Sequence, residues 1–178
     1  MPRWYAVTTQ SRHEKVVTEH LKSRSIEAFL PVITTPSRWK DRRVLIDRPI
    51  FPGYVFTHIG LHERQNVFSI PGVVRMLSFN GKPAEIDDAE IEAVRICLTA
   101  GNKLEPHPFL KTGEHVRVKS GSLMGLEGVV TRHKNQCRIV VSITLIHQSL
   151  AVEIDAHLLE SLNASPLDSS SPQPALLR

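Results

Sequence analysis

Two short segments constrain the fold of this 178-residue chain more than any other feature. Residues 51–56 read Phe-Pro-Gly-Tyr-Val-Phe, and residues 119–130 carry three glycines among apolar residues. Proline fixes φ and glycine permits a tight backbone, so the first segment predicts a turn that leads into a strand. Glycines spaced as in the second segment are typical of the turns of a small barrel. Together they indicate two different structural units in one chain.

The composition is that of a globular protein able to bury a core, with 41% hydrophobic and 22% charged residues. No apolar stretch approaches the roughly 20 residues needed to cross a bilayer, and the N-terminus lacks a signal-peptide pattern. We therefore expect a cytoplasmic protein with no membrane partner. Cys97 and Cys137 stand in apolar patterns and are expected to be buried thiols rather than a disulfide. Among the nine histidines only His13 and His20 could share a helix face, so we predict no metal and no cofactor.

The net charge of +4 is unevenly distributed along the chain. Residues 1–60 contain ten Lys and Arg against five Asp and Glu, whereas the remainder is close to balanced. A local basic excess favours contact with a polyanion, although it is equally typical of a solvated surface. Nucleic-acid binding therefore needs support from a structural motif.

The N-terminal part alternates irregularly between strand and helix patterns. A capping box at Ser11-Arg12-His13-Glu14 predicts a helix to about Arg24 with Val17 and Leu21 on its buried face. The segment Asp87-Asp88-Ala89-Glu90 offers the N-cap of a second helix that Gly101 ends. Strands are expected at residues 4–9, 28–34, 44–46, 50–59 and 73–79. This pattern predicts an α+β sandwich with helices on a mixed or antiparallel sheet.

The C-terminal part shows alternation typical of short strands and no long helix, which predicts a small β-barrel. We assign residues 1–100 to the N-terminal domain, 101–110 to a linker, 111–162 to the barrel and 163–178 to a disordered tail. Within the first strand, Trp4 and Tyr5 are adjacent and so face opposite ways. We expect one of them in the core and the other nearer the surface.

These segments resemble the NusG family of transcription elongation and antitermination factors. The resemblance covers about residues 3–162, and residues 119–130 are similar to its KOW motif. It implies an NGN-type domain linked to a KOW, SH3-like barrel, and a monomer that binds the clamp helices of bacterial RNA polymerase. It also implies contact with non-template or upstream DNA, and with the ribosome or termination factor Rho through the barrel. A specialised paralogue, similar to RfaH or UpxY, is favoured over the general factor.

The resemblance places the polymerase contact on the first segment. Tyr54 and Phe56 lie two residues apart on a strand and point to the same face, so two rigid aromatic side chains could anchor an interface. Phe51, Pro52 and Gly53 are assigned as the supporting turn. The alternative is that one or both aromatic side chains belong to the core.

Two groups of residues are candidates for nucleic-acid contact. The first is a basic hairpin tip that combines four cations with one aromatic side chain, which suits phosphate contact with base stacking. It consists of Arg38, Trp39, Lys40, Arg42 and Arg43. The second lies on or near the first helix, where the resemblance to RfaH implies DNA contact, and consists of Arg12, His13, Lys15 and His20. A solvated hairpin and an ordinary polar helix face remain the alternatives.

In the barrel, Leu123 and Met124 are the candidate partner-binding residues. Leu123 stands where the family often has an aromatic side chain, and its smaller area makes Rho the less favoured partner. A free-standing KOW-type protein that binds RNA or the ribosome is the alternative function. No nucleophile and base pattern supports an enzyme, so we predict no catalytic residue.

Overall fold

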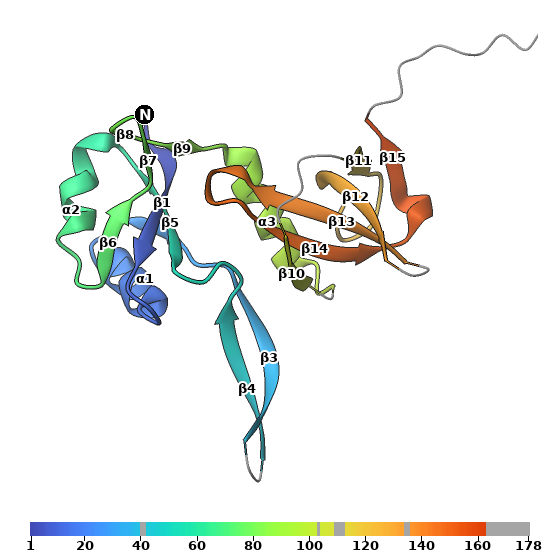
Figure 1. Cartoon of the computed structure of the whole chain (residues 1–178), viewed down its shortest axis with the longest axis horizontal. Helices are drawn as coiled ribbons and strands as arrows, with labels where there is room; N and C mark the ends of the chain where they lie inside the picture. Colours follow the sequence, from blue (N-terminus) through green and yellow to red (C-terminus); the bar gives the residue numbers. More distant parts are fainter. Residues whose placement is uncertain (40–41, 103, 109–112, 134–135, 163–178) are drawn as a thin grey trace, which may run out of the picture.

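The computed structural model describes residues 1–39, 42–102, 104–108, 113–133 and 136–162. Its N-terminal part is built on an antiparallel sheet with the strand order β2-β5-β1-β6, and β9 also pairs with β1 (Figure 1). The bounds of these strands are β1 Arg3–Thr9, β2 Glu27–Phe29, β5 Tyr54–Ile59, β6 Val73–Met76 and β9 Glu85–Ile86. The helices are α1 Glu14–Ser23, α2 Arg64–Phe68 and α3 Asp88–Thr99, with a short 3-10 turn at Leu61–Glu63. The predicted α+β class is confirmed.

Both faces of this sheet are covered, which explains the burial of its alternating side chains. Tyr5 and Val7 lie in a cluster with Val17 and Leu21 of α1. Trp4 lies in the other cluster, on the face that α3 covers. Trp4 is 4% exposed and Tyr5 is 1% exposed, so the expectation that one of them lies near the surface is wrong.

The first helix was predicted correctly except at its start. Val17 and Leu21 are buried as expected, but the N-cap is His13 and no side chain caps the helix. The Ser11 capping box is therefore not formed, because Arg12 adopts a φ of 63° and turns the chain before the helix begins. For α3 the prediction is confirmed, since the Asp87 carboxylate accepts a hydrogen bond from the Ala89 N–H at 3.0 Å.

Two hairpins leave the N-terminal sheet. Strands β3 (Val32–Trp39) and β4 (Arg42–Pro49) pair with each other along their whole length and project from the body of the molecule (Figure 1). The short pair β7 (Ser78–Phe79) and β8 (Lys82–Pro83) closes at Asn80 and Gly81, both with positive φ. The hairpin of β3 and β4 carries the predicted basic tip.

The C-terminal part is an antiparallel sheet with the strand order β10-β14-β13-β12-β11-β15. Its bounds are β10 Leu104–Pro108, β11 Glu114–Val118, β12 Glu127–His133, β13 Gln136–Ile143, β14 Gln148–Ile154 and β15 Leu159–Ser161, with 3-10 turns at Thr144–Ile146 and Ala156–Leu158. Strand β10 was not predicted, and it lies inside the stretch that the sequence suggested as a linker. Two prolines masked the strand pattern there.

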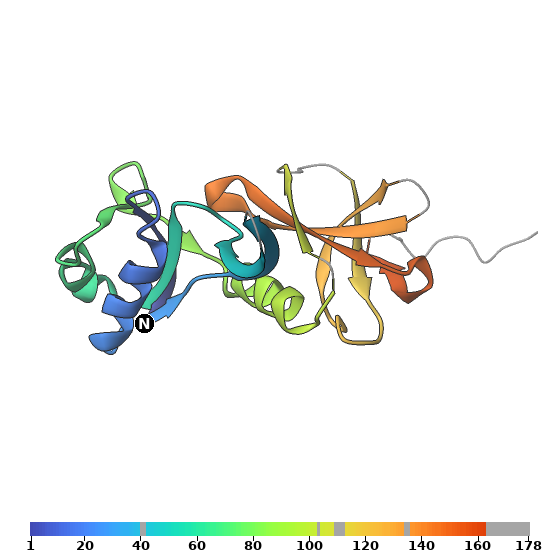
Figure 2. The same ribbon diagram turned by 90° about the horizontal axis from the view of Figure 1, so that it is seen from below.

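Helix α3 lies between the N-terminal sheet and the C-terminal strands, as the two views in Figures 1 and 2 agree. One apolar cluster runs from Trp4 and Phe56 through Ile91 and Val94 of α3 to the buried side chains of the barrel, such as Leu150. The Thr144 N–H donates to the carboxylate of Glu90 at 3.3 Å. The two parts of the chain therefore pack against each other through α3.

Candidate functional site

Residues 51–54 form a tight turn that delivers the chain into β5. The Tyr54 N–H donates to the Phe51 carbonyl at 3.2 Å, and Gly53 has a φ of +83°. Proline at the second position and a positive φ at the third are the features of a type II turn. Nothing lies within 4 Å of a Cβ built on Gly53, so glycine is required here by backbone conformation and not by crowding.

Glu14 fixes this turn to the rest of the domain. Its side chain is the first of α1 and is only 7% exposed. Its Oε1 accepts a hydrogen bond from the Gly53 N–H at 2.8 Å, and the Thr9 N–H donates to the Gly53 carbonyl at 2.9 Å. The sequence placed Glu14 in a capping box and missed this role. The sequence signal that was available is an acidic residue in the first turn of α1, where its carboxylate is free to accept a hydrogen bond from another segment.

Replacement of Glu14 by alanine should lower the free energy of unfolding by about 1.5–3 kcal/mol, because the lost hydrogen bond has a charged acceptor in a buried place. Glu14→Gln retains a side-chain oxygen that can accept the hydrogen bond from the Gly53 N–H, so it should lose clearly less unfolding free energy. Chemical denaturation of both variants and wild type measures the difference. Equal losses for alanine and glutamine would contradict a turn-holding role for the acceptor.

The aromatic side chains of the segment divide into buried and accessible ones. Phe51 is 1% exposed and Phe56 is 0% exposed, and their rings meet edge to face at 6.0 Å. Tyr54 is half-buried and packs against the same cluster, while Pro52 is exposed. Tyr54 and Phe56 thus share a face, but in this structure only Tyr54 of the two is open to a partner. We therefore reassign Phe56 from contact residue to support.

A crevice of about 430 Å³ adjoins the turn. One wall comes from the end of β4 and the turn, with Pro49, Ile50 and Pro52. The other wall comes from the C-terminal sheet, with His107 of β10 and Ser149 of β14 among its residues. The exposed side of the turn therefore faces the barrel across a shallow opening.

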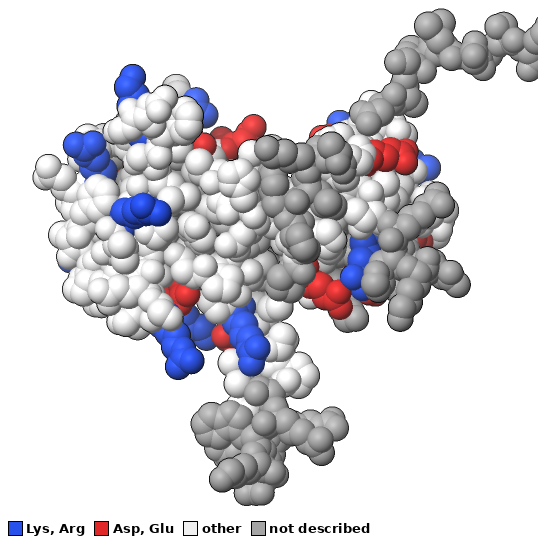
Figure 3. Space-filling model, in the orientation of Figure 1, with Lys and Arg blue, Asp and Glu red and all other residues white. Residues whose placement is uncertain are grey.

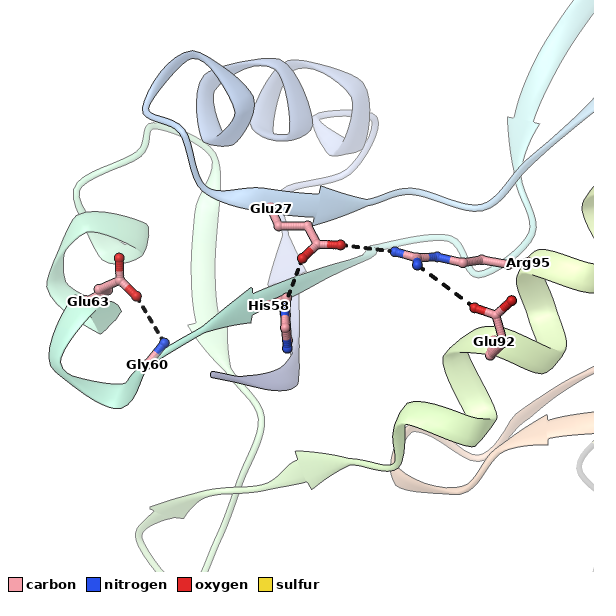
Figure 4. A network of polar contacts seen from close by, with 6 residues as sticks. All are labelled: Glu27, His58, Gly60, Glu63, Glu92 and Arg95. Carbon is pink, nitrogen blue, oxygen red and sulfur yellow. Dashed lines mark hydrogen bonds and ion pairs between the residues drawn. The ribbon is translucent and has the colours of Figure 1, made fainter. Parts of the chain in front are cut away.

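A polar and aromatic cluster holds α3 to the N-terminal sheet. The Arg95 guanidinium lies over the rings of Trp4 and Phe29, at 5.1 and 5.2 Å from their centroids. It also donates to Glu27 at 3.2 Å, and His58 Nδ1 lies 2.8 Å from the other oxygen of Glu27 (Figure 4). The same view shows Glu92 beside Arg95 on α3. This cluster stabilises the face that carries the aromatic segment.

Glu27 makes the stability of this cluster depend on pH. Partial burial would raise its pKa, but the hydrogen bonds from His58 and Arg95 outweigh this and lower the pKa below the ordinary 4.5. A lowered folded-state pKa stabilises the protein above the unfolded-state pKa, and that contribution is lost as the pH falls through the folded-state pKa. We expect wild type to be more stable than Glu27→Gln near pH 6 and the difference to vanish on acidification below 4.5. Denaturant titrations at several pH values measure this difference in stability. A difference that does not change with pH would contradict a contribution from the ionised Glu27 carboxylate.

The two groups of basic residues lie on neighbouring elements. Arg12, His13, Lys15 and His20 are all exposed. Lys15 Nζ lies 3.6 Å from Asp47 of β4, and Asp47 in turn accepts from Thr34 at 2.7 Å. The N-terminal end of α1 is therefore in contact with the hairpin, and Figure 3 shows Lys and Arg side chains gathered at the hairpin base.

The hairpin tip itself is described only in part. Arg38 pairs with Arg43, and Trp39 pairs with Arg42, in the backbone register of β3 and β4. Lys40 lies outside the described residues. The backbone thus brings the four described candidates into two adjacent cross-strand pairs.

In the barrel, one of the two candidate partner-binding residues is buried and the other is exposed. Leu123 is 3% exposed and belongs to the core cluster, whereas Met124 is 66% exposed. They lie in a loop in which Gly121 and Gly125 both have positive φ. Of the two candidates, Met124 alone is presented to solvent, while Leu123 is part of the core.

Burial raises the pKa of the Cys97 thiol to about 12, so it does not supply a thiolate near neutral pH. Among the described residues, no three His, Cys, Asp or Glu side chains gather as a metal site would require. None of the helices in the described ranges combines the length and apolar character required to traverse a membrane.

Comparison with known proteins points to one family. Residues 2–95 match the family model described as transcription termination factor NusG. The chain is similar to the transcription termination/antitermination protein NusG of Borreliella burgdorferi, with 24% identity over 89% of this chain and 98% of that protein. It is also similar to NusG of Helicobacter pylori strain 26695, with 26% identity over 86% of this chain and 95% of that protein. The structure resembles that of Thermotoga maritima NusG with a TM-score of 0.50 and 20% identity over 92% of this chain and 98% of that one.

Proposed function

Because this chain belongs to the NusG family of transcription termination and antitermination factors, we propose that it binds bacterial RNA polymerase through its N-terminal domain and recruits a second partner through its barrel. The division into residues 1–100 and 111–162 assigns one partner to each unit. The protein acts in the cytoplasm and catalyses no reaction. The observation that carries the proposal is the half-buried Tyr54 on a turn fixed by Glu14.

The turn suits a docking role for physical reasons. Its backbone is fixed by Pro52, by the positive φ of Gly53 and by the Glu14 carboxylate. Little conformational entropy is therefore lost when Tyr54 enters a partner's pocket. Tyr54 packs against the apolar cluster that contains Phe51 and Phe56, and a rigid tyrosine is among the side chains most often found at the centre of an interface.

An isolated fragment containing the polymerase clamp helices tests the location of this contact. Calorimetric titration should show binding of the full chain to that fragment. Met124→Ala, on the exposed barrel loop, is the matched control and should bind as wild type does. Binding to whole polymerase but not to the fragment would overturn the proposed location.

The cations near α1 and those of the hairpin tip are proposed to contact DNA, non-template or upstream of the transcribed site. They are Arg12 and Lys15, which are exposed, and the four cations of the tip, where Trp39 is proposed to stack on a base. The contact between Lys15 and Asp47 supports one continuous surface rather than two separate ones. His13, the N-cap of α1, and His20, in its last turn, are also exposed and are included in the proposal.

Binding to single-stranded DNA should therefore weaken steeply with salt. Six cations that each contact one phosphate predict a slope of about −4 for the logarithm of the association constant against the logarithm of the salt concentration. The double variant Arg12→Gln, Lys15→Gln should show a shallower slope, whereas Lys119→Gln on the barrel should not. Fluorescence anisotropy at several salt concentrations provides the measurement, and a slope near zero for wild type would refute the electrostatic contact.

For the barrel we propose the ribosome as the partner, with Rho less favoured, and Met124 as the exposed contact. The interpretation of this protein as a specialised paralogue rests on leucine, rather than an aromatic residue, at position 123. Pull-down of ribosomes and of Rho by wild type and by Met124→Ala distinguishes these partners. Retention of RNA or ribosomes without any polymerase binding would favour the free-standing RNA-binding alternative.

A further inference from the structure

A cleft of about 630 Å³ lies between α3 and the C-terminal sheet. Figure 2 shows α3 beside strands of that sheet. One wall of the cleft is formed by α3, and the other is formed by β11, β12 and β13 with the segments that flank them. None of the described residues that line it is among those assigned above to polymerase, to DNA or to the partner of the barrel.

The cleft exists because small residues face each other across it. Ala89 and Ala93 are four residues apart, so they lie on one face of α3. Gly128 is on the opposite wall, where a Cβ would lie 2.7 Å from the Val140 carbonyl oxygen. Packed protein interiors rarely leave a hollow of this size. Volumes of about 300–1,000 Å³ are instead typical of sites that bind a small ligand.

The surface inside the cleft is mainly apolar. Ile96 of α3 contributes to it from one side, and Leu126, Val129 and Val141 contribute from the barrel. Leu126 and Val141 are members of the apolar core cluster that α3 and the barrel share. An apolar body placed in the cleft would be removed from water on two sides, which favours its binding.

Three carboxylates give the cleft a negative charge. Glu90 and Glu92 line it from α3, and Glu127 lines it from β12. Among the described residues of the lining there is neither Lys nor Arg, and the other titratable side chain is the exposed His115. The charge of the lining therefore favours a cation and disfavours an anion.

The protein itself uses only part of the hydrogen-bonding capacity of these carboxylates. Glu90 accepts from the Thr144 N–H at 3.3 Å, and Glu127 accepts through Oε1 from Arg117 Nε at 2.8 Å. An ionised carboxylate offers about four acceptor positions, so both side chains can accept further hydrogen bonds from a ligand. A cationic donor gives the strongest contact of this kind.

We propose that this cleft binds an amphipathic amine, in which an ammonium group is carried on an apolar body. The ammonium pairs with the carboxylates of Glu90, Glu92 and Glu127, and the apolar body lies between α3 and the barrel. An acid of the same shape is repelled by the same carboxylates. This site goes beyond the proposed function, and its occupation requires neither polymerase nor DNA.

Three probes of one shape test the ligand class on the full chain: phenylbutylamine, phenylbutanol and phenylbutyrate. In nitrogen-15 correlation spectra of wild type, the amine should shift amides of α3, β12 and β13 with a dissociation constant on the order of 1 mM or lower. The alcohol should bind about fivefold more weakly, and the acid more weakly still. Absence of amine binding, equal binding of amine and alcohol, or shifts confined to other elements would overturn the proposal.

Variants of the two walls locate the site. Ala93→Phe fills the cleft and should weaken amine binding by about tenfold or more, whereas Ala156→Phe, on an exposed 3-10 turn of the barrel, should bind as wild type does. The double variant Glu90→Gln, Glu92→Gln keeps the shape of the lining and should reduce the preference for amine over alcohol to about twofold or less. Glu19→Gln, exposed on α1, is the charge control. An unchanged preference in the double variant would contradict the ammonium contact.

Two occupants other than an amine would be recognised in spectra recorded without a probe. If deletion of residues 163–178 shifts the amides that line the cleft, the C-terminal segment of the chain itself occupies it. If those shifts depend on protein concentration, a second copy of the chain occupies it. Either result would overturn the amine as the ligand of this cleft.

Discussion

Tyr54→Ala is expected to abolish detectable binding to RNA polymerase while the N-terminal domain stays folded. The ring is half-buried on a turn held by Glu14, so its removal takes away an anchor without opening a closed core. Truncation of a central interface aromatic costs about 2–4 kcal/mol of binding free energy. Affinity for a reconstituted elongation complex and thermal unfolding of the free protein measure the two effects separately.

The matched control is Tyr54→Phe, which keeps the ring. Among the described residues, no hydrogen bond is formed by the Tyr54 hydroxyl, so Tyr54→Phe should remain folded and retain most of the affinity. Wild-type affinity in the alanine variant would remove Tyr54 from the interface. A collapse of stability in that variant would show that the ring is chiefly a core side chain.

Phe56→Ala should have the opposite effect to Tyr54→Ala. Its main consequence should be a loss of unfolding free energy. Phe56 is fully buried and packs against Phe51 and Phe29, with ring centroids at 6.0 and 6.2 Å. Removal of a buried phenylalanine ring leaves a cavity and costs about 3–5 kcal/mol of unfolding free energy. Denaturant unfolding followed by circular dichroism measures the loss, and Phe56→Leu, which refills part of the volume, should lose less. A loss below about 1 kcal/mol for the alanine variant would contradict the core assignment.

Much of the N-terminal fold could be predicted from the sequence because its helices carry clear periodic patterns. Val17 and Leu21 marked the buried face of α1, and Asp87 marked the start of α3. The burial of both Trp4 and Tyr5 could not be predicted from alternation alone. Alternation gives the two faces of a strand, but whether each face is covered depends on the helices that pack later in the chain.

Strand β10 could not be predicted for a related reason. Its five residues include two prolines, which usually argue against a strand. The pairing is supported by Arg138 and Glu153, which lie more than thirty residues further along the chain. Such contacts override local preference and leave no local pattern.

The candidate site was found in the sequence as a segment, but the roles within it required the structure. The Pro-Gly turn and the shared face of Tyr54 and Phe56 followed from backbone rules. The distinction between an accessible tyrosine and a buried phenylalanine did not, since both are aromatic side chains on one strand face. Glu14 and Arg95 were missed because their partners, Gly53 and the rings of Trp4 and Phe29, are distant in sequence.

A native gel shift of a reconstituted RNA polymerase elongation complex, with wild type and Tyr54→Ala run side by side, tests whether Tyr54 docks on polymerase. We expect wild type to shift the complex and folded Tyr54→Ala to leave it unshifted. Absence of a shift with folded wild-type protein, together with retention of RNA, would contradict polymerase docking and favour a free-standing RNA-binding protein.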